Sequence, residues 1–351
     1  MTKQSTPQVL VHGASGHTGR FVIAELLQRG VRPVLAGRNA DRLHAAAREV
    51  GEAAAELPCR TVDLADAASL AEALADIDVV VNCAGPFLDT ALPLATAAVA
   101  AGAHYVDVTA EQPAVQALYD ALDAPAKAAG VSVIPALAFY GGLADLLVTD
   151  AIGGGEARGA EVTVAIGLDH WWPTAGTRRT GERNTATRQV IRDGRLVPLA
   201  ADAEATRWDF ADVLGDQAVV EVPFSEVITI HRHLPVDRLT SYLTAAPLAE
   251  IRDPETAAPT SIDESGRSAQ RFVVEAVVRT ATGERRSAVS GRDIYAITAP
   301  IVVEGVARLL DGRHHGAGAL APGSAFDAAD MLGALAAHPA GVTRAADAVL
   351  N

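Results

Sequence analysis

Three glycines at intervals of three follow a short apolar run in the stretch VLVHGASGHTGR, which begins at Val9. In a strand–turn–helix unit, the first glycine permits a tight turn and the second lets the backbone approach a pyrophosphate. The third lets the helix pack closely on the strand. Gly13, Gly16 and Gly19 have this placement, with the spacing GxxGxxG. Because free N–H groups and the positive dipole end of the following helix attract an anion, the pattern predicts a dinucleotide site.

The residues after the second apolar run indicate which dinucleotide is bound. NAD sites usually carry Asp or Glu there, whereas an arginine accommodates the 2′-phosphate of NADP. The stretch VLAGRNADRL has no carboxylate at the end of the run, and Arg38 and Arg42 follow it. NADP(H) is therefore favoured over NAD(H), the alternative being that both arginines are ordinary surface cations. Asp63-Leu64, after the third run, are expected to border the adenine.

Further cofactor contacts are expected after the fourth and fifth runs. The fourth ends in VVNCAGPF, beside the expected nicotinamide, where Gly85-Pro86 form a rigid turn and Cys83 can also be read as a small buried hydrophobe. The fifth ends in HYVDVTAE, which brings Asp107, Thr109 and Glu111 near the cleft. The predicted cofactor-binding set is Gly13, Ala14, Ser15, Gly16, His17, Thr18, Gly19, Arg38, Asn39, Arg42, Asp63, Leu64, Cys83, Ala84, Gly85, Pro86, Phe87 and Thr109.

The first part of the chain alternates short β-rich runs with alanine- and leucine-rich segments of helical length. Six strands separated by five helices predict a parallel, doubly wound α/β sheet covered on both faces. The expected strands are Val9–His12, Pro33–Ala36, Arg60–Val62, Asp78–Asn82, Tyr105–Val108 and Val131–Ile134. The expected helices are Thr18–Arg29, Ala40–Val50, Ala67–Ala75, Ala91–Ala101 and Pro113–Ala129.

After Leu147 the pattern changes to strands with hairpin signals. Asp193-Gly194 separates two alternating runs, and a longer hairpin turns near Thr282-Gly283. Residues 160–290 are therefore expected to form an antiparallel sheet. Residues 293–310 predict a long helix that Pro300 kinks or restarts, and the polar tract 252–268 predicts a mobile loop.

Composition narrows the class of protein. The 351 residues are 49% hydrophobic and 21% charged, which is typical of a soluble globular protein. The net charge of −14 argues against a general nucleic-acid or anionic-membrane binder. Two cysteines without a CxxC pair, a polar N-terminus and no apolar run near 18 residues predict a cytoplasmic protein without a disulfide framework or membrane span.

Several of these segments resemble the saccharopine dehydrogenase-like oxidoreductases: GASGHTGR, LAGRNADRL, VVNCAGPF, HYVDVTAE, and DIYAITAPIVVEGVARLLDG with GALAPGSAFDA. Within that superfamily, the chain resembles the bacterial saccharopine dehydrogenase-like reductases and trans-acting enoyl reductases. The resemblance implies a Rossmann-type NADP(H) domain at residues 1–140 and a substrate and dimerisation α+β domain, with a mainly antiparallel sheet, at 141–290. It also implies a C-terminal helical segment, 291–351, that packs back on the Rossmann domain, and a homodimer.

Two departures from the family put the reaction partner in doubt. Thr109-Ala110-Glu111 stands where relatives commonly have Thr-Gly-Glu, and 143–146, Leu-Ala-Asp-Leu, stands where they commonly have Pro-Ser-Asp-Leu. Because those loops face the substrate in the family, resemblance predicts the cofactor better than the substrate.

Two side chains are candidate proton donors. Tyr140 is a phenol expected at a strand end beside two glycines, and its alternative role is to cap the core. His170 follows the strand EVTVAIGLDH, where the second domain can cover the nicotinamide, and its alternative is an ordinary loop histidine. Trp171-Trp172 pack a domain interface or form a pocket wall.

The remaining arginines and histidines do not point to one particular function. Four arginines in the tract PTAGTRRTGERNTATR can hold a substrate carboxylate or a phosphopantetheine phosphate, or belong to a solvated loop: Arg178, Arg179, Arg183 and Arg188. Two histidines alternate in an expected strand and two lie in an expected loop, and we predict no metal site because no third ligand accompanies them: His231, His233, His314 and His315.

These observations predict an NADPH-dependent reductase of an imine or an activated C=C bond in a small metabolite, which a carrier protein can present. The alanine-, arginine- and glycine-rich composition fits bacterial secondary metabolism. A non-catalytic NADP(H)-sensing regulatory protein is the alternative from another class. An NAD-linked dehydrogenase of the amino-acid type is the alternative among enzymes.

Overall fold

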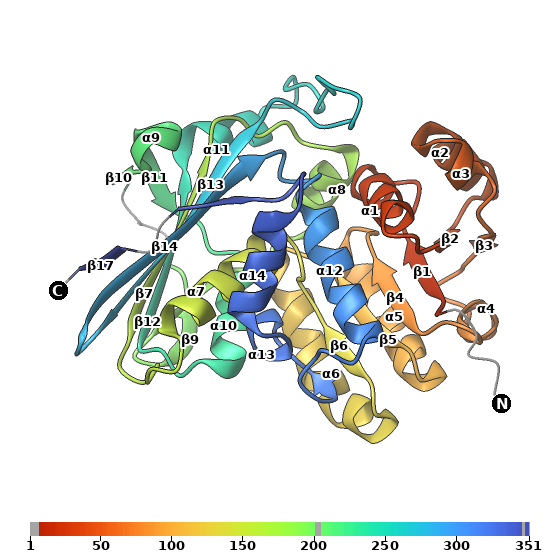
Figure 1. Cartoon of the computed structure of the whole chain (residues 1–351), viewed down its shortest axis with the longest axis horizontal. Coiled ribbons are helices and arrows are strands. Elements are labelled where there is room, and N and C mark those ends of the chain that lie inside the picture. The colour runs from red at the N-terminus through yellow and green to blue at the C-terminus, as the bar shows by residue number, and fades with distance from the viewer. Residues whose placement is uncertain (1–6, 201–204, 346–347, 351) are drawn as a thin grey trace.

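The computed structural model describes residues 7–200, 205–345 and 348–350, which form two sheets with helices between and around them (Figure 1). All neighbouring strands of the first sheet pair in parallel, in the order β15-β6-β5-β4-β1-β2-β3. The six expected strands are confirmed with small shifts at their ends, whereas β15 was not expected. The strands are β1 Val9–His12, β2 Val34–Gly37, β3 Cys59–Thr61, β4 Val79–Asn82, β5 His104–Asp107, β6 Ser132–Ile134 and β15 Gly318–Ala319.

Helices cover both faces of this sheet, as a doubly wound fold requires. Alternate residues of β1 divide between the two layers: Val9 and Val11 pack with α1, and Leu10 packs with α4, α5 and α6. The helix α5 begins at Phe87 instead of Ala91, because Glu111 from another loop accepts hydrogen bonds from its first amides. The helices are α1 His17–Gln28, α2 Ala40–Val50, α3 Glu52–Ala55, α4 Ala67–Leu74, α5 Phe87–Ala101 and α6 Gln112–Ala129.

The second sheet has the order β10-β11-β12-β7-β13-β14-β16, with β8 beside β12, β9 beside β8, and β17 beside β14. Both expected hairpins are present, as β8–β9 and β13–β14. The expectation of an antiparallel sheet needs one correction, because β12 pairs with β7 in parallel. The strands are β7 Glu161–Leu168, β8 Gln189–Arg192, β9 Arg195–Pro198, β10 Thr206–Asp209, β11 Asp216–Glu221, β12 Arg238–Thr244, β13 Arg271–Thr280, β14 Gly283–Arg292, β16 Thr343–Arg344 and β17 Ala348–Leu350.

The helices after residue 135 correct three further expectations. His231 and His233 end the helix α10 instead of alternating on a strand. The long helix expected from residue 293 begins only at Thr298, so Pro300 lies in its first turn, where its missing N–H costs nothing. The arginine-rich tract, for which a solvated loop was one of two alternatives, contains α8. The helical segments are the π-helix η1 Phe139–Leu143, then α7 Ala144–Ile152, α8 Ala175–Arg183, α9 Ala211–Leu214, α10 Glu226–His233, α11 Ala245–Arg252, α12 Thr298–Leu310, α13 Pro322–Ala325 and α14 Ala328–Ala337.

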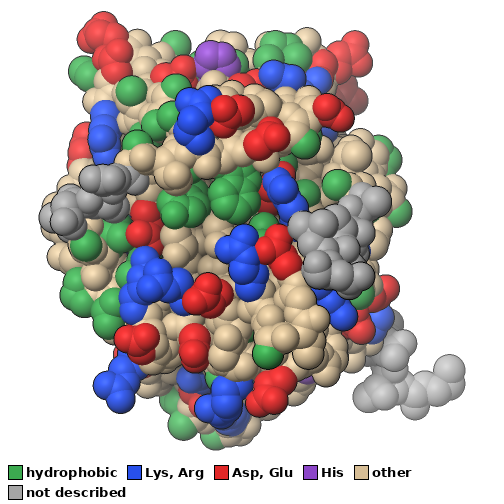
Figure 2. Space-filling view, turned by 90° about the vertical axis from the view of Figure 1, so that its left-hand side faces the viewer, with side chains coloured by type: hydrophobic (Ala, Val, Ile, Leu, Met, Phe, Trp, Pro, Cys, Tyr) green, Lys and Arg blue, Asp and Glu red, His purple; other side chains and the backbone are tan. Residues whose placement is uncertain are grey.

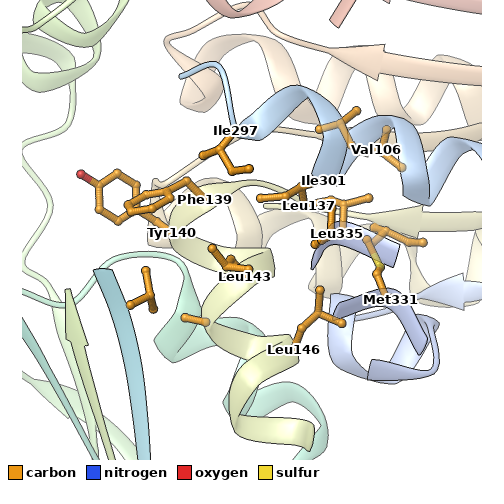
Figure 3. Close-up of a cluster of buried hydrophobic side chains, with 14 of the residues drawn as sticks. Val106, Leu137, Phe139, Tyr140, Leu143, Leu146, Ile297, Ile301, Met331 and Leu335 are labelled. Carbon is orange, nitrogen blue, oxygen red and sulfur yellow. The ribbon is translucent and has the colours of Figure 1, made fainter. Parts of the chain in front are cut away.

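One hydrophobic cluster joins the two sheets. Leu143 of η1 and Leu146 of α7 come after β6 in the chain. They pack in the same buried cluster as Ile301 of α12 and Met331 of α14 (Figure 3). Both helices lie between the sheets in Figure 1, and α12 contacts α1, β4 and β5. A continuous apolar junction favours a fixed relative placement of the two sheets over free domain motion.

The segment after residue 291 adds strands to both sheets, β15 to the first and β16 and β17 to the second. The domain boundaries at residues 140 and 290 therefore stay predictions. The outer side of the second sheet carries interspersed acidic and basic side chains around a central hydrophobic area (Figure 2). In the ranges that the structure describes, no helix has both the length and the apolar character needed to cross a bilayer.

Candidate cofactor and substrate site

Residues 13–19 form the turn between β1 and α1, and each of its glycines has a different environment. Gly13 has φ +77°, and a Cβ there would lie 2.7 Å from the backbone N of Ala84. A Cβ on Gly19 would lie 2.4 Å from the carbonyl oxygen of Gly13, so this glycine lets the helix pack on the turn. A Cβ on Gly16 would have only the Gly13 oxygen, at 3.1 Å, within 4 Å. Gly16 therefore presents the open side of the turn.

The start of α1 leaves hydrogen-bond donors available at this turn. Gly16 is the N-cap residue, so no side chain caps the helix, and its first turn has no acidic residue. The first amides of a helix lack intrahelical acceptors. The Nε2 atom of His17 is buried and also has no partner in the described part of the chain. The unpartnered amides fit the diphosphate of a dinucleotide, and the ring of His17 lies beside them.

Arg38 and Arg42 lie beyond the end of β2 and are exposed. Neither guanidinium has a hydrogen-bond or ion-pair partner among the residues described. Burial lowers the pKa of His12, and the positive charge of Arg38 contributes to the decrease, so Arg38 lies near the end of β1. The position and free donors of Arg38 fit a 2′-phosphate on the ribose next to this edge.

Other predicted cofactor residues already make local hydrogen bonds. The Oδ1 atom of Asn39 accepts the amide of Arg42 at 2.9 Å and caps α2. The Oδ1 atom of Asp63 accepts the amide of Ala65 at 2.9 Å, and Leu64 packs partly buried against the core. Their side chains thus shape the loops around the adenine position, and direct contact with a cofactor stays a prediction.

The loop after β4 lies against the glycine turn, and hydrogen bonds to Glu111 hold its C-terminal end in place. The Glu111 carboxylate accepts the amide of Phe87 at 2.7 Å and that of Leu88 at 3.2 Å. The loop contains the cis peptide Gly85–Pro86. Burial raises the pKa of Cys83 to about 12, so its thiol stays protonated and serves as a packed side chain and not as a nucleophile.

A buried polar chain, which the sequence pattern did not reveal, crosses the ends of β1, β4 and β5. The Nδ1 atom of His12 lies 3.1 Å from Oδ1 of Asn82, and that oxygen also accepts the amide of Ala84 at 3.0 Å. The Nδ2 atom of Asn82 donates to the Tyr105 hydroxyl, which donates to Asp107. Burial raises the pKa of Asp107 to about 6. This chain fixes the loop that carries Ala84 and Gly85.

Thr109 and its neighbours were expected near the cleft, but the structure has them buried. Thr109 Oγ1 accepts the amide of Glu111 at 3.0 Å, and its carbonyl accepts the Ser225 hydroxyl at 3.1 Å. Asp107 accepts the amides of Thr109 and Ala136. These residues therefore connect the first sheet to the second domain and support the site from inside.

Tyr140 belongs to the π-helix η1, which corrects the expectation of a strand end. Its ring stacks on Phe224 with centroids 4.2 Å apart and lies 5.7 Å from the ring of Trp171. Figure 3 shows its hydroxyl directed away from the hydrophobic cluster. That hydroxyl is buried and has no partner among the described residues. Burial, the first of several causes, raises the pKa of Tyr140 well above its usual value, so the hydroxyl keeps its proton.

The side chain of His170 interacts with Glu250 and Trp172 instead of with the rings around Tyr140. Its Nδ1 atom lies 2.7 Å from Oε1 of Glu250, and its ring stacks on Trp172 at 4.9 Å. The next residue, Trp171, is buried, and its Nε1 donates to the Tyr295 hydroxyl at 3.2 Å. Trp171, and not His170, thus contacts the rings around Tyr140.

The helix α8 of the second domain crosses to the loop after β4. The guanidinium of Arg183 lies 2.9 Å from the Asp89 carboxylate at the start of α5. Arg178 donates to the carbonyl oxygens of Asp253 and Thr256, while Arg179 is exposed. The fourth predicted arginine, Arg188, lies beyond α8 and stacks over Phe224. The tract therefore bridges the first domain and the aromatic rings.

Comparison with known proteins decides the type of the first domain. Residues 9–134 match the family described as saccharopine dehydrogenase NADP binding domain. This segment is therefore similar to the NADP-binding domain of saccharopine dehydrogenases. The match supports NADP(H) as the cofactor and confirms the resemblance seen in the sequence, while the roles of the glycine turn and Arg38 in binding it stay predictions.

Two groups of relatives extend the comparison. The chain is 32% identical over 142 residues to a Mycobacterium tuberculosis protein provisionally named a trans-acting enoyl reductase, covering 40% of this chain and 34% of that protein. It is 33% identical over 106 residues to the trans-acting enoyl reductase of Mycobacterium ulcerans, covering 30% and 25%. The matches thus span about a third or less of these relatives' length.

A solved structure of saccharopine dehydrogenase (L-Glu forming) from Saccharomyces cerevisiae has the same fold. The TM-score is 0.66 at 15% identity, with 99% of this chain and 100% of that chain covered. The shared fold therefore includes both sheets, and the predicted fold class is confirmed.

Proposed function

We propose that this chain is an NADPH-dependent reductase that acts on an imine or an activated carbon–carbon double bond of a small metabolite. The observation that carries the proposal is the open face of the glycine turn at Gly16, with the free guanidinium of Arg38 at the neighbouring strand end. The name of the mycobacterial relatives supports reduction of an enoyl group, and the shared fold of saccharopine dehydrogenase supports an imine.

The chain's own residues must orient the substrate and supply a proton, because NADPH, when bound, supplies the hydride. Tyr140 is the donor that we propose. Its hydroxyl has no internal acceptor among the described residues, so it is free to donate to the nitrogen or carbon of the reduced bond. Because this hydroxyl is buried, water must reach it after product release to return the proton. His170 is the second candidate, although Glu250 already engages its ring.

Substitution of each candidate donor tests this assignment. NADPH consumption is measured with a panel of enoyl thioesters, free and carrier-linked, and cyclic imines. For the substrate that is turned over, Tyr140→Phe should lower kcat by roughly a hundredfold without changing NADPH affinity, because only the proton is removed. His170→Gln should leave kcat near the wild-type value. The reverse pattern would assign the proton to His170.

An NADP(H)-sensing regulatory protein is the second candidate function. The contact of α8 with the loop after β4 favours it, because a side chain that covers the nicotinamide position permits binding without turnover. Tight NADPH binding with no turnover across the substrate panel would support this candidate.

Three further features belong to the proposal. The family resemblance supports a homodimer, the relatives' name supports a carrier-bound substrate, and the composition supports a cytoplasmic role in secondary metabolism. Light scattering on the purified protein measures the oligomeric state, and the mass of a dimer is the expected result.

A further inference from the structure

Four aromatic side chains form a cluster at the domain junction, named here the junction cluster: Tyr140, Trp171, Phe224 and Tyr295. The ring of Tyr295 lies 5.4 Å from that of His17, at the start of α1. At the other end, the guanidinium carbon of Arg188 lies 4.6 Å from the centroid of Phe224. The cluster therefore connects the glycine turn to one arginine by a continuous series of contacts.

Phe224 is fixed in this cluster by polar groups from both domains. Its carbonyl accepts Nε2 of Gln112, at the start of α6, at 2.9 Å. Its amide donates to Oε1 of Glu226, also at 2.9 Å. Because both backbone groups of Phe224 are held by buried side chains, its ring is a rigid surface and not a mobile loop side chain.

Two buried polar atoms next to this ring have no partner among the described residues, the hydroxyl of Tyr140 and Oε2 of Glu226. Buried polar groups are nearly always hydrogen-bonded, so two unpartnered atoms in one place indicate that water or a polar ligand group completes them. They are independent of the glycine turn, and neither belongs to the predicted cofactor set.

Arg188 is the cation at the exposed end of the cluster. A guanidinium has five N–H donors, and within the described ranges Arg188 uses one, on the carbonyl oxygen of Pro223 at 2.5 Å. Arg252 and Glu226 both lie close enough to act on this guanidinium through their charges. Two cations thus face each other here, and Arg188 remains exposed with free donors.

We infer that the junction cluster binds a substrate with an apolar segment and an anionic group, a carboxylate or a phosphate, and that Arg188 holds the anion. The planar fork of the guanidinium matches either group, and the buried rings of Phe224 and Trp171 make the surroundings of the remainder apolar. This inference rests on the proposed function, because it brings the reducible bond near Tyr140. It makes Arg188 a residue that determines specificity.

Calorimetry with simple probes tests the inference without the natural substrate. Hexanoate, hexyl phosphate and the uncharged hexanamide are titrated into the protein, with and without saturating NADP⁺. The better of the two anions should bind, and Arg188→Gln should weaken it roughly tenfold or more while leaving hexanamide unchanged. Whichever anion binds more tightly identifies the class. Arg188→Lys should give an intermediate affinity because it keeps the charge and loses the fork.

Arg195→Gln is the matched control, since Arg195 is exposed on the same hairpin and has no partner in the described chain. Equal losses in both variants, equal affinity for the anions and hexanamide, or no anion binding to wild type would overturn the inference. The titrations without coenzyme distinguish this inference from the proposed function. A protein that binds the anion through Arg188 but does not bind NADPH would refute the proposed function and leave the inference about Arg188 standing.

Discussion

Thr180 lies directly against Gly85, and its Oγ1 atom is 2.8 Å from the position that a Cβ on Gly85 would occupy. Thr180 belongs to α8, and Gly85 belongs to the loop after β4, at the expected nicotinamide position. The pair Arg183–Asp89 holds the same helix to the first domain. The second domain therefore already touches the cofactor loop in this conformation.

This contact predicts that a larger side chain at position 180 blocks the nicotinamide selectively. Thr180→Phe should weaken NADPH binding by roughly tenfold or more, because the ring would overlap the space beside Gly85. Binding of 2′-phospho-ADP-ribose, which lacks the nicotinamide, should stay unchanged. Fluorescence titration measures both. Arg179→Phe, on the exposed side of α8, is the control, and equal losses for the two ligands would contradict the assignment of this loop to the nicotinamide.

Two glycines of the turn, Gly16 and Gly19, are predicted to respond differently to substitution by alanine. Gly19→Ala should lower the free energy of unfolding by about 1–3 kcal/mol, because its Cβ would collide with the Gly13 carbonyl oxygen. Gly16→Ala should fold normally, since its φ of −77° suits alanine, yet bind NADPH roughly tenfold more weakly. Urea unfolding and NADPH titration separate the two effects. Full NADPH affinity in Gly16→Ala would show that the open face does not contact the coenzyme.

We predict that ionisation of the Asp107 carboxyl lowers the free energy of unfolding as the pH rises. Its folded pKa of about 6 lies above the unfolded value of 3.8, so the folded state binds more protons between those values. Stability supplied by the neutral carboxyl is complete below pH 4 and is lost as the pH passes 6, by at most about 3 kcal/mol. Asp107→Asn keeps a neutral amide at this position, so it should gain stability relative to wild type between these pH values.

Urea unfolding of wild type and Asp107→Asn at pH 4.5 and 7.5, roughly either side of the transition, measures this difference. The stability difference between the two proteins should change by about 1–3 kcal/mol in favour of the variant at the higher pH. A difference that does not depend on pH would mean that the carboxyl titrates normally in the folded protein.

Glu304 joins α12 to the end of α1. Its two carboxylate oxygens pair with Arg29 at 2.6 Å and with Arg308 at 3.0 Å, and Arg308 is 1% exposed. Glu304→Leu should lower the free energy of unfolding by about 3 kcal/mol, because it leaves the buried Arg308 and the partly buried Arg29 without this partner. Glu49→Leu, which removes the exposed pair with Arg20, should cost under about 1 kcal/mol. Similar losses in the two variants would argue against a buried network at Glu304.

The first domain could be predicted from sequence because its signals are local. Each buried strand is a continuous apolar run, and Gly13 to Gly19 lie within one turn. The two-residue strand β15 could not be predicted, because Gly318-Ala319 has no periodicity and pairs only through the tertiary structure. His231 and His233 were misassigned because alternation over three residues does not distinguish a strand from the end of a helix.

The candidate substrate site could be predicted only in part. Tyr140 and Arg188 were named from their residue types, but the side chains that connect them, Phe224 and Glu226, lie far along the chain from Tyr140. Their proximity arises from the packing of α10 against η1. The buried chain from His12 to Asp107 was missed for the same reason, since adjacent strands place those residues side by side only after folding.

The central claim is that the glycine turn and Arg38 bind NADP(H), and calorimetric titration with NADPH and NADH tests it most directly. The account predicts that wild type binds NADPH at least roughly tenfold more tightly than NADH, and that Arg38→Ala loses this preference while still binding NADH. Absence of binding heat with either coenzyme would contradict the account at its foundation, and an unchanged preference in Arg38→Ala would contradict the role of Arg38.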